Sequence, residues 1–591
     1  MSTFIIAMQW MTGEMIMKNH SYFEMRAFLY PREEKQSAEC KLNELGSLWF
    51  CTEKNVKRKL NQFAEEGKLI YTPGKGRGNL SRVVFHRPFQ QEIEEAVQQF
   101  VQRDQLEEVI SLLQLPIPKT WIANVSKEIQ SLFGIHSSDQ PKDVLRTALT
   151  RKLTTLDPLH ASITFETFII HQLGDTLVTY DQERDLLKPH LAHNWESNEE
   201  ERIWSFYLRK GVRFHNQHVM TSEDVRYTFE RFRTNSASHF WLVEDIEQIE
   251  CLSPFTIRFR LRRPNALFPR YLSFLNLVIL PINEPFDENK WIGTGPFHIK
   301  KRTDTLLILQ AFENYFHTRP LLDEIEMYRV PIETTNSVLY EVDNYKETNK
   351  AYQHKQDIEV GFRFLAFNFK RNTIIHHPSF RKAIYHLMDI RKLWTDLGRN
   401  NLQEASSYFF WKSKHQQKDF NRVKELLEDA GYQGELIRVY TLDKQNSLEE
   451  AEWFRKEASK VGLQLEIKIY KLTEYYDRSL EEADLLFMGE VASTDYHLSF
   501  LGAFLNKALI FNRFFSEDYL EALQVYFEKI KQATDWKTRE YWIDEAERFI
   551  HQETLFLYLY HPIKNRTFHP MIKDIKFESF GYVDFKKLWV K

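Results

Sequence analysis

Cysteine is scarce in this chain, with three residues in 591, and no two of them lie close together in the sequence. Cys40, Cys51 and Cys251 form no CxxC pair, and three thiols are too few to cross-link a chain of this size in an oxidising compartment. We therefore expect a protein of a reducing compartment, the cytoplasm.

Long hydrophobic runs are missing as well. The apolar segment LSFLNLVILP lies between Arg270 and Glu284, well short of the roughly 18 uncharged apolar residues that a transmembrane helix needs. Residues 1–17 contain a short apolar run, but no basic region precedes it and Thr12, Gly13 and Glu14 interrupt it. We predict neither a signal peptide nor a membrane partner, and we assign residues 1–17 no function.

Known catalytic and cofactor motifs are also absent. The sequence has no GxSxG, no glycine fingerprint for a dinucleotide and no Cys/His signature. The nearest histidine groupings, His215 with His218 and His376 with His377, have no acidic or Cys partners at metal-ligand spacing. We predict no enzyme, no metal and no cofactor; the alternative, a hydrolase built on the same body, would show turnover of candidate ligands.

What the chain does contain is abundant core material and an uneven charge. Hydrophobic residues make up 43% of it, and its length predicts about three to five structural units. The net charge is −4, yet residues 18–90 hold 14 Lys and Arg against 8 Asp and Glu, a balance of +6 that leaves −10 for the remainder. This asymmetry indicates a nucleic-acid-binding module joined to an acidic body.

Residues 52–67, TEKNVKRKLNQFAEEG, are predicted to form an amphipathic helix. Thr52 suits its start and Gly67 its end, and apolar residues recur at i, i+4 and i+7 from Val56. Its opposite face carries side chains that suit the base edges and phosphates of the major groove: Lys54, Asn55, Lys57, Arg58 and Asn61. The alternative is a solvated basic face, the commoner explanation of a lone run of charges.

The order of the neighbouring elements favours DNA binding. Two short helices are expected before this one, the second capped by Ser37, and two β-prone runs follow at 69–71 and 82–85 around a Gly-rich tip. Three helices and a hairpin predict a winged helix-turn-helix domain at 18–88, with double-stranded DNA as its partner. The wing would contact phosphates through Lys75, Arg77 and Arg82. The tip is no nucleotide P-loop, because it lacks GxxxxGK[ST] and joins two strands.

Two further regions follow the wing. Apolar residues at helical spacing predict a helical connector at 89–140, either a spacer or a dimerisation element, with a domain boundary near residue 140 in the segment SSDQP. From residue 141 onward, short strands alternate with longer helices, which predicts an α/β body of roughly 450 residues. Such a body is larger than most single cores and should divide into lobes.

Six segments of this body resemble, in order, the landmarks of extracytoplasmic solute-binding proteins of the oligopeptide and dipeptide class. They are LTTLDPLHAS, LLKPHLAHNWES, WSFYLRKGVRFHNQHVMTSEDVRYTFERF, GTGPFHI, LAFNFKRN with HHPSFRKAIYHLMDI, and VKELLEDAGY. The resemblance implies a type II periplasmic-binding-protein-like fold, in which two lobes joined by crossing strands close on a ligand. It places lobe I at about 141–360 and 555–591, and lobe II at about 361–554. Taken alone, it implies a solute or peptide receptor of a membrane transporter.

A winged helix fused to such a body resembles the SgrR family of bacterial transcriptional regulators. The matching segments of the first part are CTEKNVKRKL and GKGRGNLSRVVF, so the resemblance covers the whole multidomain chain. It implies a cytoplasmic DNA-binding regulator whose body senses a small-molecule effector. In the best-known members this role is connected with sugar-phosphate stress, and a sugar phosphate is one implied effector.

One segment of lobe II departs from the pattern of peptide-binding proteins, G-W-x-A-D-Y-x-D-P-x-x-F-L, whose first Asp meets the peptide amine. Here GEVASTDYHLSFL has Glu490 in place of Trp and Ser493 in place of that Asp. A neutral hydroxyl cannot form the charge-assisted bond that an ammonium group needs, so a peptide is disfavoured unless Asp495 takes the role. Glu490, Ser493 and Asp495 are the candidate ligand-binding residues; the alternative is that the segment drifted after ligand binding was lost.

Overall fold

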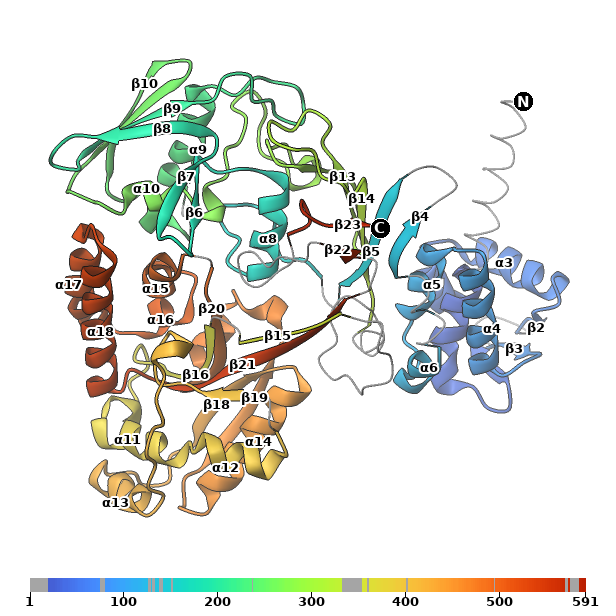
Figure 1. Cartoon of the computed structure of the whole chain (residues 1–591). Helices are drawn as coiled ribbons and strands as arrows, with labels where there is room; N and C mark the ends of the chain where they lie inside the picture. Colours follow the sequence, from blue (N-terminus) through green and yellow to red (C-terminus); the bar gives the residue numbers. More distant parts are fainter. Residues whose placement is uncertain are drawn as a thin grey trace.

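The computed structural model describes residues 20–74, 80–125, 129, 133–137, 142–149, 152–235, 238–331, 353–358, 361–399, 402–493, 495–568, 572–573 and 584–590. An N-terminal unit of helices and a small sheet lies beside a larger body of two lobes (Figure 1). The predicted fold class, a winged helix-turn-helix unit joined to a two-lobed α/β body, is confirmed.

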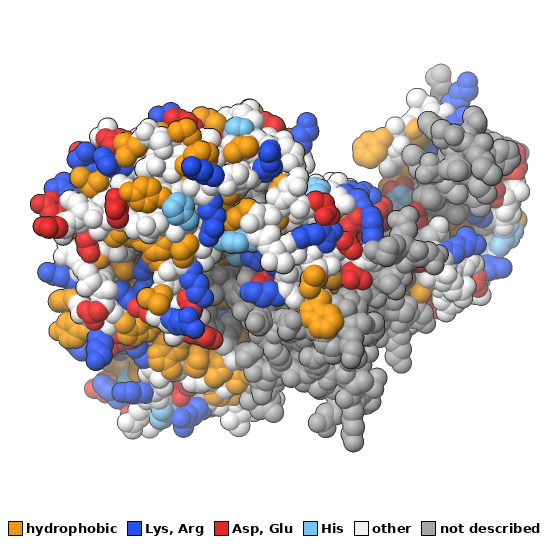
Figure 2. All heavy atoms as spheres, turned by 45° about the horizontal axis from the view of Figure 1, so that its top comes forward, with side chains coloured by type: hydrophobic (Ala, Val, Ile, Leu, Met, Phe, Trp, Pro, Cys, Tyr) orange, Lys and Arg blue, Asp and Glu red, His pale blue; other side chains and the backbone are white. Residues whose placement is uncertain are grey.

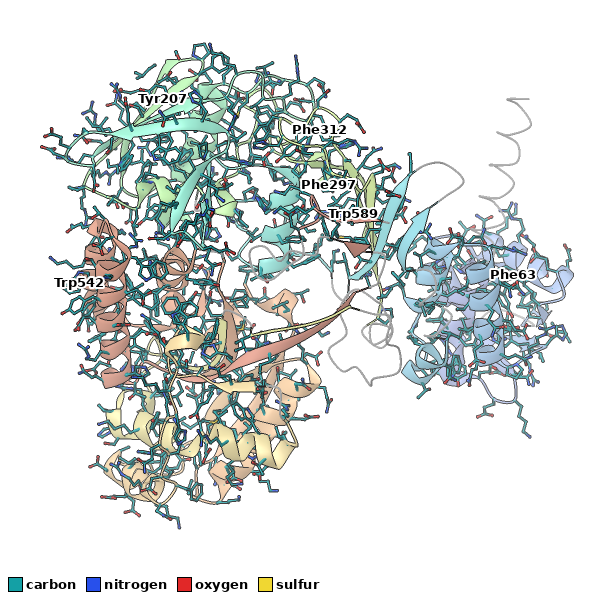
Figure 3. All side chains as sticks on the ribbon, viewed as in Figure 1. Phe63, Tyr207, Phe297, Phe312, Trp542 and Trp589 are labelled. Carbon is teal, nitrogen blue, oxygen red and sulfur yellow. The ribbon has the colours of Figure 1, made fainter. Side chains whose placement is uncertain are left out.

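The N-terminal unit folds around one apolar core. Residues 20–29, α2 (Leu42–Leu48) and α3 (Glu53–Glu65) pack around Met25, Leu45 and Leu60, and Phe63 lies inside the unit (Figure 3). The strands β2 (Leu69–Thr72) and β3 (Ser81–Phe85) form the wing.

One local expectation in this unit is wrong. Ser37 does not begin a helix, because residues 37–40 form β1 (Ser37–Cys40), which pairs antiparallel with β3. Ala38 and Cys40 alternate into the core as in a strand, after a turn through left-handed Lys35 and Gln36.

Three helices connect the winged helix to the body: α4 (Phe89–Gln102), α5 (Leu106–Leu113) and α6 (Lys119–Asn124). Their buried face contacts Ala27 on one side, and Ile308 and Tyr328 of lobe I on the other. Residues 134–137, expected within the helical connector, instead form β4 (Gly134–Ser137), which pairs with a lobe I strand. The connector therefore ends inside the lobe I sheet, and the boundary expected near residue 140 lies outside the described residues.

Lobe I is built on two main sheets, beside which β6 (Val178–Asp181) and β7 (Leu186–Pro189) form a separate two-stranded sheet. One main sheet has the order β12-β13-β14-β5-β4 and the other β10-β11-β9-β8; β5 runs parallel to β14, whereas the other pairs are antiparallel. The strands are β5 (Asp143–Leu149), β6 (Val178–Asp181), β7 (Leu186–Pro189), β8 (Ala192–Ser197), β9 (Ile203–Leu208), β10 (Ile246–Ser253), β11 (Thr256–Leu261), β12 (Phe297–Arg302), β13 (Leu306–Ala311) and β14 (Glu324–Arg329). The helices include α8 (Thr164–Leu173), α9 (Ser222–Thr234) and α10 (Phe268–Tyr271). Phe585 and Leu588, near the C-terminus, pack in the same core as Leu145.

Lobe II surrounds a mixed sheet of order β15-β21-β16-β20-β18-β19, with β17 on β21. Its strands are β15 (Gln353–Ile358), β16 (Gly361–Phe367), β17 (Leu402–Glu404), β18 (Ile437–Leu442), β19 (Leu465–Tyr470), β20 (Leu485–Val491) and β21 (Phe556–Phe568). Its helices are α11 (Pro378–Leu387), α12 (Ile390–Leu397), α13 (Arg422–Asp429), α14 (Gln445–Ser459), α15 (Tyr496–Leu505), α16 (Ile510–Phe514), α17 (Glu517–Gln532) and α18 (Trp536–Glu553).

Strand β21 links the two lobes. Its residues 556–560 pair with β16 and so belong to the sheet of lobe II, although lobe I was expected from residue 555. Its later residues pair with β15, and these two long strands run together toward lobe I (Figure 1).

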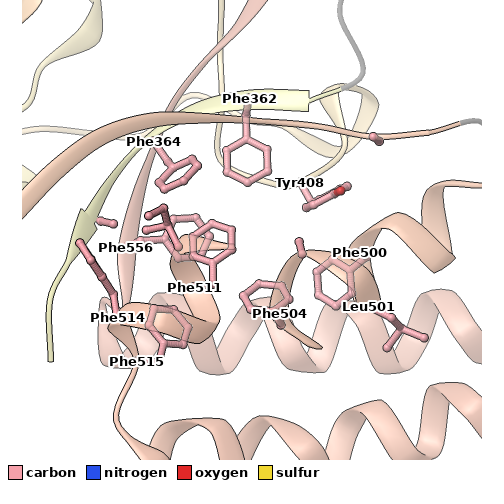
Figure 4. Packing of buried hydrophobic residues seen from close by; sticks show 14 of the residues in the cluster. Phe362, Phe364, Tyr408, Phe500, Leu501, Phe504, Phe511, Phe514, Phe515 and Phe556 are labelled. Atoms are coloured by element: carbon pink, nitrogen blue, oxygen red, sulfur yellow. The ribbon is translucent and has the colours of Figure 1, made fainter. Parts of the chain in front are cut away.

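An aromatic layer packs α15 and α16 against β16. Phe364 lies 4.7 Å from Phe511 between ring centroids, and Phe511 lies 4.5 Å from Phe556 and 4.9 Å from Phe504 (Figure 4). Because this layer is buried, it fixes the wall of lobe II that faces lobe I.

Candidate functional site

The first candidate surface lies on α3. Val56, Leu60 and Phe63 are buried, so the opposite side of the helix faces outward. The exposed side chains of α3 include those expected from the sequence, Lys54, Asn55, Lys57, Arg58 and Asn61, together with Glu53 and Glu65 near its ends. None of the five expected residues makes an ion pair within the described part of the chain, so the three cations have no protein partner there. By contrast, the charges on the body are mixed, with both signs interspersed over the face in Figure 2.

The wing contributes one described cation. Arg82 is exposed on β3, and its Nε donates to Ser37 Oγ at 2.8 Å, which holds the side chain across the wing sheet. Lys75 and Arg77 lie outside the described residues. Lys59, by comparison, is directed into the domain, because its Nζ donates to Ser21 Oγ at 3.0 Å and lies 4.6 Å from the centre of the Trp49 ring.

Sequence reasoning missed Phe50 in the turn between α2 and α3. Its side chain is 97% exposed and its backbone is left-handed, with φ at 48°. If α3 enters a major groove, an exposed apolar group beside it suits contact with a thymine methyl group. The available signal was a bulky aromatic residue three positions before the start of the predicted basic helix.

The second candidate site is a cavity of about 180 Å³ where the two lobes meet. Lobe I contributes, among others, Ser162, Ile163, Thr167, His239, Phe274 and Asn276, and lobe II contributes Phe364, Tyr475, Met488, Glu490, Ser493 and Asn506. Most of the lining is apolar, and the described residues that line it include neither Lys nor Arg.

Polar groups on the lobe I side of the cavity are largely satisfied within the protein. Asn276 Nδ2 donates to the carbonyls of Pro158 and Ala161 at 2.8 and 2.7 Å. His239 contacts the Ala161 carbonyl at 3.0 Å, and burial lowers its pKa to about 4, so it is neutral at pH 7. Asn506 of lobe II reaches across to His239 Nδ1 at 3.3 Å.

The three candidate ligand residues are not placed alike. Glu490 and Ser493 both line the cavity. The Ser493 hydroxyl lies 2.8 Å from the Ser499 hydroxyl, which in turn donates to the Asp495 carbonyl. Asp495 is not among the described residues that line the cavity.

Asp495 is instead engaged with lobe I. Its carboxylate accepts two hydrogen bonds from Arg270, from Nη2 at 2.7 Å and Nε at 2.8 Å, and caps α15 through the Leu498 N–H. Burial acts to raise its pKa, but Arg270 outweighs burial and holds the pKa below the ordinary 3.8. This bidentate pair leaves Asp495 poorly suited to receive a ligand amine.

The same pair belongs to a network that joins the lobes. Arg270 Nη1 donates to Asp185 at 2.6 Å, and Asp185 also accepts from Arg539 of α18 in lobe II. Lys531 of α17 lies 3.5 Å from Asp245 of lobe I. The lobes are thus in contact through ion pairs as well as through one apolar core that contains residues of both.

Glu490 differs from the other acids at this interface. It lines the cavity from β20 and makes no hydrogen bond or ion pair with any described residue. Burial raises its pKa to about 8. The hydroxyl of Tyr408 is also buried without a partner among the described residues, and the pKa of Tyr408 is raised first by burial and then by the charge of Glu490.

Other site types find no support in the described residues. None of the described helices is long and apolar enough to span a bilayer. Nowhere in the described ranges do three or more His, Cys, Asp or Glu side chains group so as to hold a metal ion.

Two family models match the chain. The model for bacterial extracellular solute-binding proteins, family 5 middle region, matches residues 187–511. The model for the sugar transport-related sRNA regulator N-terminal region matches residues 20–135, which include the winged helix and α4 to α6.

Curated relatives share both parts. The chain is 28% identical over 573 residues to the uncharacterized protein YhjP of Bacillus subtilis, covering 94% of this chain and 97% of the relative. It is 23% identical to the HTH-type transcriptional regulator SgrR of Yersinia enterocolitica, and the match covers 95% of this chain and 97% of the relative.

Solved structures resemble the body. A periplasmic binding protein DppA from Helicobacter pylori, in complex with the peptide STSA, matches with a TM-score of 0.66 at 22% identity, covering 76% of this chain and 98% of that one. A dipeptide-binding protein from Pseudoalteromonas in complex with Met-Leu matches with a TM-score of 0.67 at 19% identity, covering 76% and 100%. At this identity the likeness establishes the fold alone.

Proposed function

Because the chain belongs to family 5 of the bacterial extracellular solute-binding proteins and has the domain architecture of the SgrR regulators, we propose that it is a cytoplasmic DNA-binding transcriptional regulator whose body responds to a small solute. The observation that carries this proposal is the outward face of α3, where three cations and two amides are exposed and unpaired on a winged helix. In this proposal α3 enters the major groove, while Arg82, Lys75 and Arg77 of the wing contact phosphates.

The connector supports a link between solute and DNA. Helices α4 to α6 share one apolar core with Ala27 of the winged helix and with Ile308 and Tyr328 of lobe I. Polar contacts add to it, since Arg146 of β5 pairs with Asp104 at 2.6 Å. A solute that binds one arrangement of the lobes more tightly than the other would favour that arrangement, and this contact would pass the change to the winged helix. The resulting shift in DNA affinity is limited by the difference between the affinities of the solute for the two arrangements.

A sugar phosphate, which the family resemblance implies as an effector, fits the cavity poorly. A phosphate is held most firmly in proteins where Arg or Lys pairs with it, and the described lining has neither; its clustered N–H groups are those at the start of α8, where Ile163 and Thr164 line the cavity. We therefore propose a small solute without a phosphate. The alternative role, a peptide receptor of a transporter, rests on the fold likeness and is weakened by Ser493 and by a cavity of only about 180 Å³.

Genome-wide recovery of DNA crosslinked to the tagged protein tests the regulator role. We expect discrete sites with the wild type and their loss in a Lys54/Lys57/Arg58 triple-alanine variant. The matched control replaces three exposed lysines of lobe II helices, Lys382, Lys424 and Lys456, by Ala and should keep every site. Absence of enrichment with the wild type, or equal loss in both triple variants, would contradict DNA binding by α3.

Binding in solution gives a second test. If Lys57 contacts a phosphate, Lys57→Ala should weaken binding to all sequences similarly and lower the slope of log affinity against log salt by about one. Lys456→Ala, which removes a lysine far along the chain on α14, should leave the slope unchanged. A wild-type slope in Lys57→Ala would remove Lys57 from that role.

A further inference from the structure

The position of Glu490 on β20 directs its side chain toward the cavity. In the antiparallel pair of β20 and β16, Glu490 lies opposite Phe362 and Met488 lies opposite Phe364. Residues paired in this way share one face of a sheet. Met488, Phe364 and Glu490 all line the cavity, so this face of lobe II forms its wall.

The described cations near this wall are not part of the cavity lining. Arg363 is paired with Gly489 between those positions, so it projects from the opposite face; a Cβ on Gly489 would lie 2.1 Å from Arg363 Nη1. Arg270 is held by Asp495 and Asp185. Arg513 donates to the carbonyls of Tyr475 and Asp477 at 2.7 and 3.1 Å. Lys507 is exposed, with its Nζ 5.6 Å from the centre of the Phe240 ring.

Glu490 is a half-buried acid that lines the cavity and has no hydrogen-bond or ion-pair partner among the described residues, and a ligand can supply that partner. Burial of an unpaired carboxylate disfavours its charge, and here burial raises the pKa of Glu490 to about 8. The nearby Tyr408 hydroxyl is fully buried and equally unpartnered within the described residues. A hydrogen-bond donor placed in the cavity, and best a cationic one, would satisfy the carboxylate.

The rest of the lining limits what can carry that donor. Phe274, Phe364 and Phe511 surround an apolar space, and the amides of Asn276 and Asn506 already donate within the protein. A carboxylate or phosphate on the same ligand would be buried without a cation to pair with, which is strongly unfavourable. This argument disfavours amino acids, peptides and sugar phosphates, for which the described lining offers no cation and only the N–H groups at the start of α8.

We propose that Glu490 selects the effector, and that the effector is a small primary monoamine with an apolar body and no carboxylate or phosphate group. This inference rests on one part of the proposed function, namely that the cavity between the lobes binds the effector. It assigns Glu490 as the group that pairs with the ammonium ion of the ligand.

Binding of such a ligand moves a proton in a defined direction. In the empty cavity at pH 7 the Glu490 carboxyl is mostly protonated; beside an ammonium ion its pKa falls and the carboxyl ionises, while the ammonium keeps its own protons. The products are one ion pair and up to one proton released to the buffer. Among the described residues around this cavity, burial and the charge of Glu490 raise the pKa of both Tyr408 and Tyr475 well above 10, and burial lowers the pKa of His239 to about 4, so these three groups do not titrate near this pH.

Isothermal titration calorimetry of the full chain tests the proposal with isopentylamine and phenethylamine as probes. Leucine and phenylalanine carry the same bodies with an added carboxylate, N-acetyl phenethylamine lacks the charge, and glucose 6-phosphate represents the anions. We expect at least one amine to bind, and each comparison compound to bind roughly tenfold or more weakly. Titration at pH 7 in two buffers of different ionisation enthalpy should show proton release on amine binding.

Variants make the assignment specific. Glu490→Gln keeps the size of the side chain and should weaken the amine roughly tenfold and abolish proton release, whereas Glu482→Gln, at an exposed acid of the same lobe, should change neither. Urea unfolding of both variants verifies that they fold. Failure of both amines to bind, tighter binding of glucose 6-phosphate, or unchanged amine binding in Glu490→Gln overturns the proposal. The loss of DNA sites in the α3 variant is measured in a separate experiment. DNA binding by α3 and amine selection by Glu490 can therefore fail independently of each other.

Discussion

At the scale of single residues, the pair of Arg270 and Asp495 is the contact that most depends on both partners. Their side chains are 8% and 4% exposed; without Arg270, Asp495 would be left as a buried charge, and without Asp495, Arg270 would keep only its contact with Asp185. We expect Asp495→Asn to lower the free energy of unfolding by about 3 to 5 kcal/mol, measured by urea denaturation. Glu223→Gln, which breaks the exposed pair with Arg226 on α9, should cost at most about 1 kcal/mol. Equal effects would show that the interlobe pair is not a buried one in solution.

The same residue predicts a dependence on pH. Since the folded pKa of Asp495 is held below 3.8, the unfolded chain takes up its proton first as the pH falls. The stability from the ion pair is therefore fully present above about pH 5 and is lost as the pH falls through the folded pKa. The difference in unfolding free energy between wild type and Asp495→Asn should be constant from about pH 5 to 8 and shrink below about pH 4. A difference that grows on acidification would contradict the assignment.

Residue patterns in the sequence predicted some site residues and not others. The apolar spacing of α3 places Lys54, Lys57 and Arg58 outward without any tertiary information. The partner of Asp495 could not be predicted, because Arg270 is 225 residues away and the pair exists only where two lobes meet. Similarly, the glycines of the GTGPF segment indicate a tight loop, but the reason for Gly295 lies in a residue far away in the sequence. A Cβ at position 295 would lie 2.4 Å from the backbone carbonyl carbon of Leu173.

At the scale of elements, strand β13 separates two cores by its alternation. Leu306 and Ile308 face the connector helices, whereas Leu307 and Leu309 face the core of lobe I with α8. The residues that receive the connector belong to a strand almost 200 positions later, and they read there as ordinary core.

Hydrogen exchange can separate the two faces of β13. Ile308→Ala should speed amide exchange in α5 and leave α8 unchanged, and Leu309→Ala should do the reverse, because each removes packing from one side only. Truncation of a buried Ile or Leu costs about 2 to 5 kcal/mol, enough to raise local opening many-fold. If both variants affect the same helices, the connector does not pack on lobe I as described.

At the scale of the whole molecule, the lobes are joined by the strands β15 and β21, by a shared apolar core and by ion pairs, among them the network around Asp185. Asp185 of lobe I accepts from Arg270 and from Arg539 of lobe II. Asp185→Asn removes the charge that both arginines share, so the contacting arrangement of the lobes should lose population. We expect a larger radius of gyration in small-angle X-ray scattering, and an unchanged profile for Glu223→Gln. An Asp185→Asn profile identical to the wild type would show that the network does not hold the lobes together.

A change of lobe arrangement can reach the DNA only through lobe I, because the connector core contains lobe I residues and, within the described chain, none of lobe II. Two sites coupled through one packed contact should show a coupling of about 1 to 3 kcal/mol, a 5- to 150-fold change in affinity. Asp185→Asn should therefore shift DNA affinity in that range without any effector, although no residue near α3 is altered. Adding Ile308→Ala, which loosens the connector, should reduce the shift, whereas adding Leu309→Ala should preserve more of it. If Asp185→Asn shifts DNA affinity equally with and without Ile308→Ala, the packed contact on β13 is not required. The arrangement of the lobes would then act on the winged helix by another route.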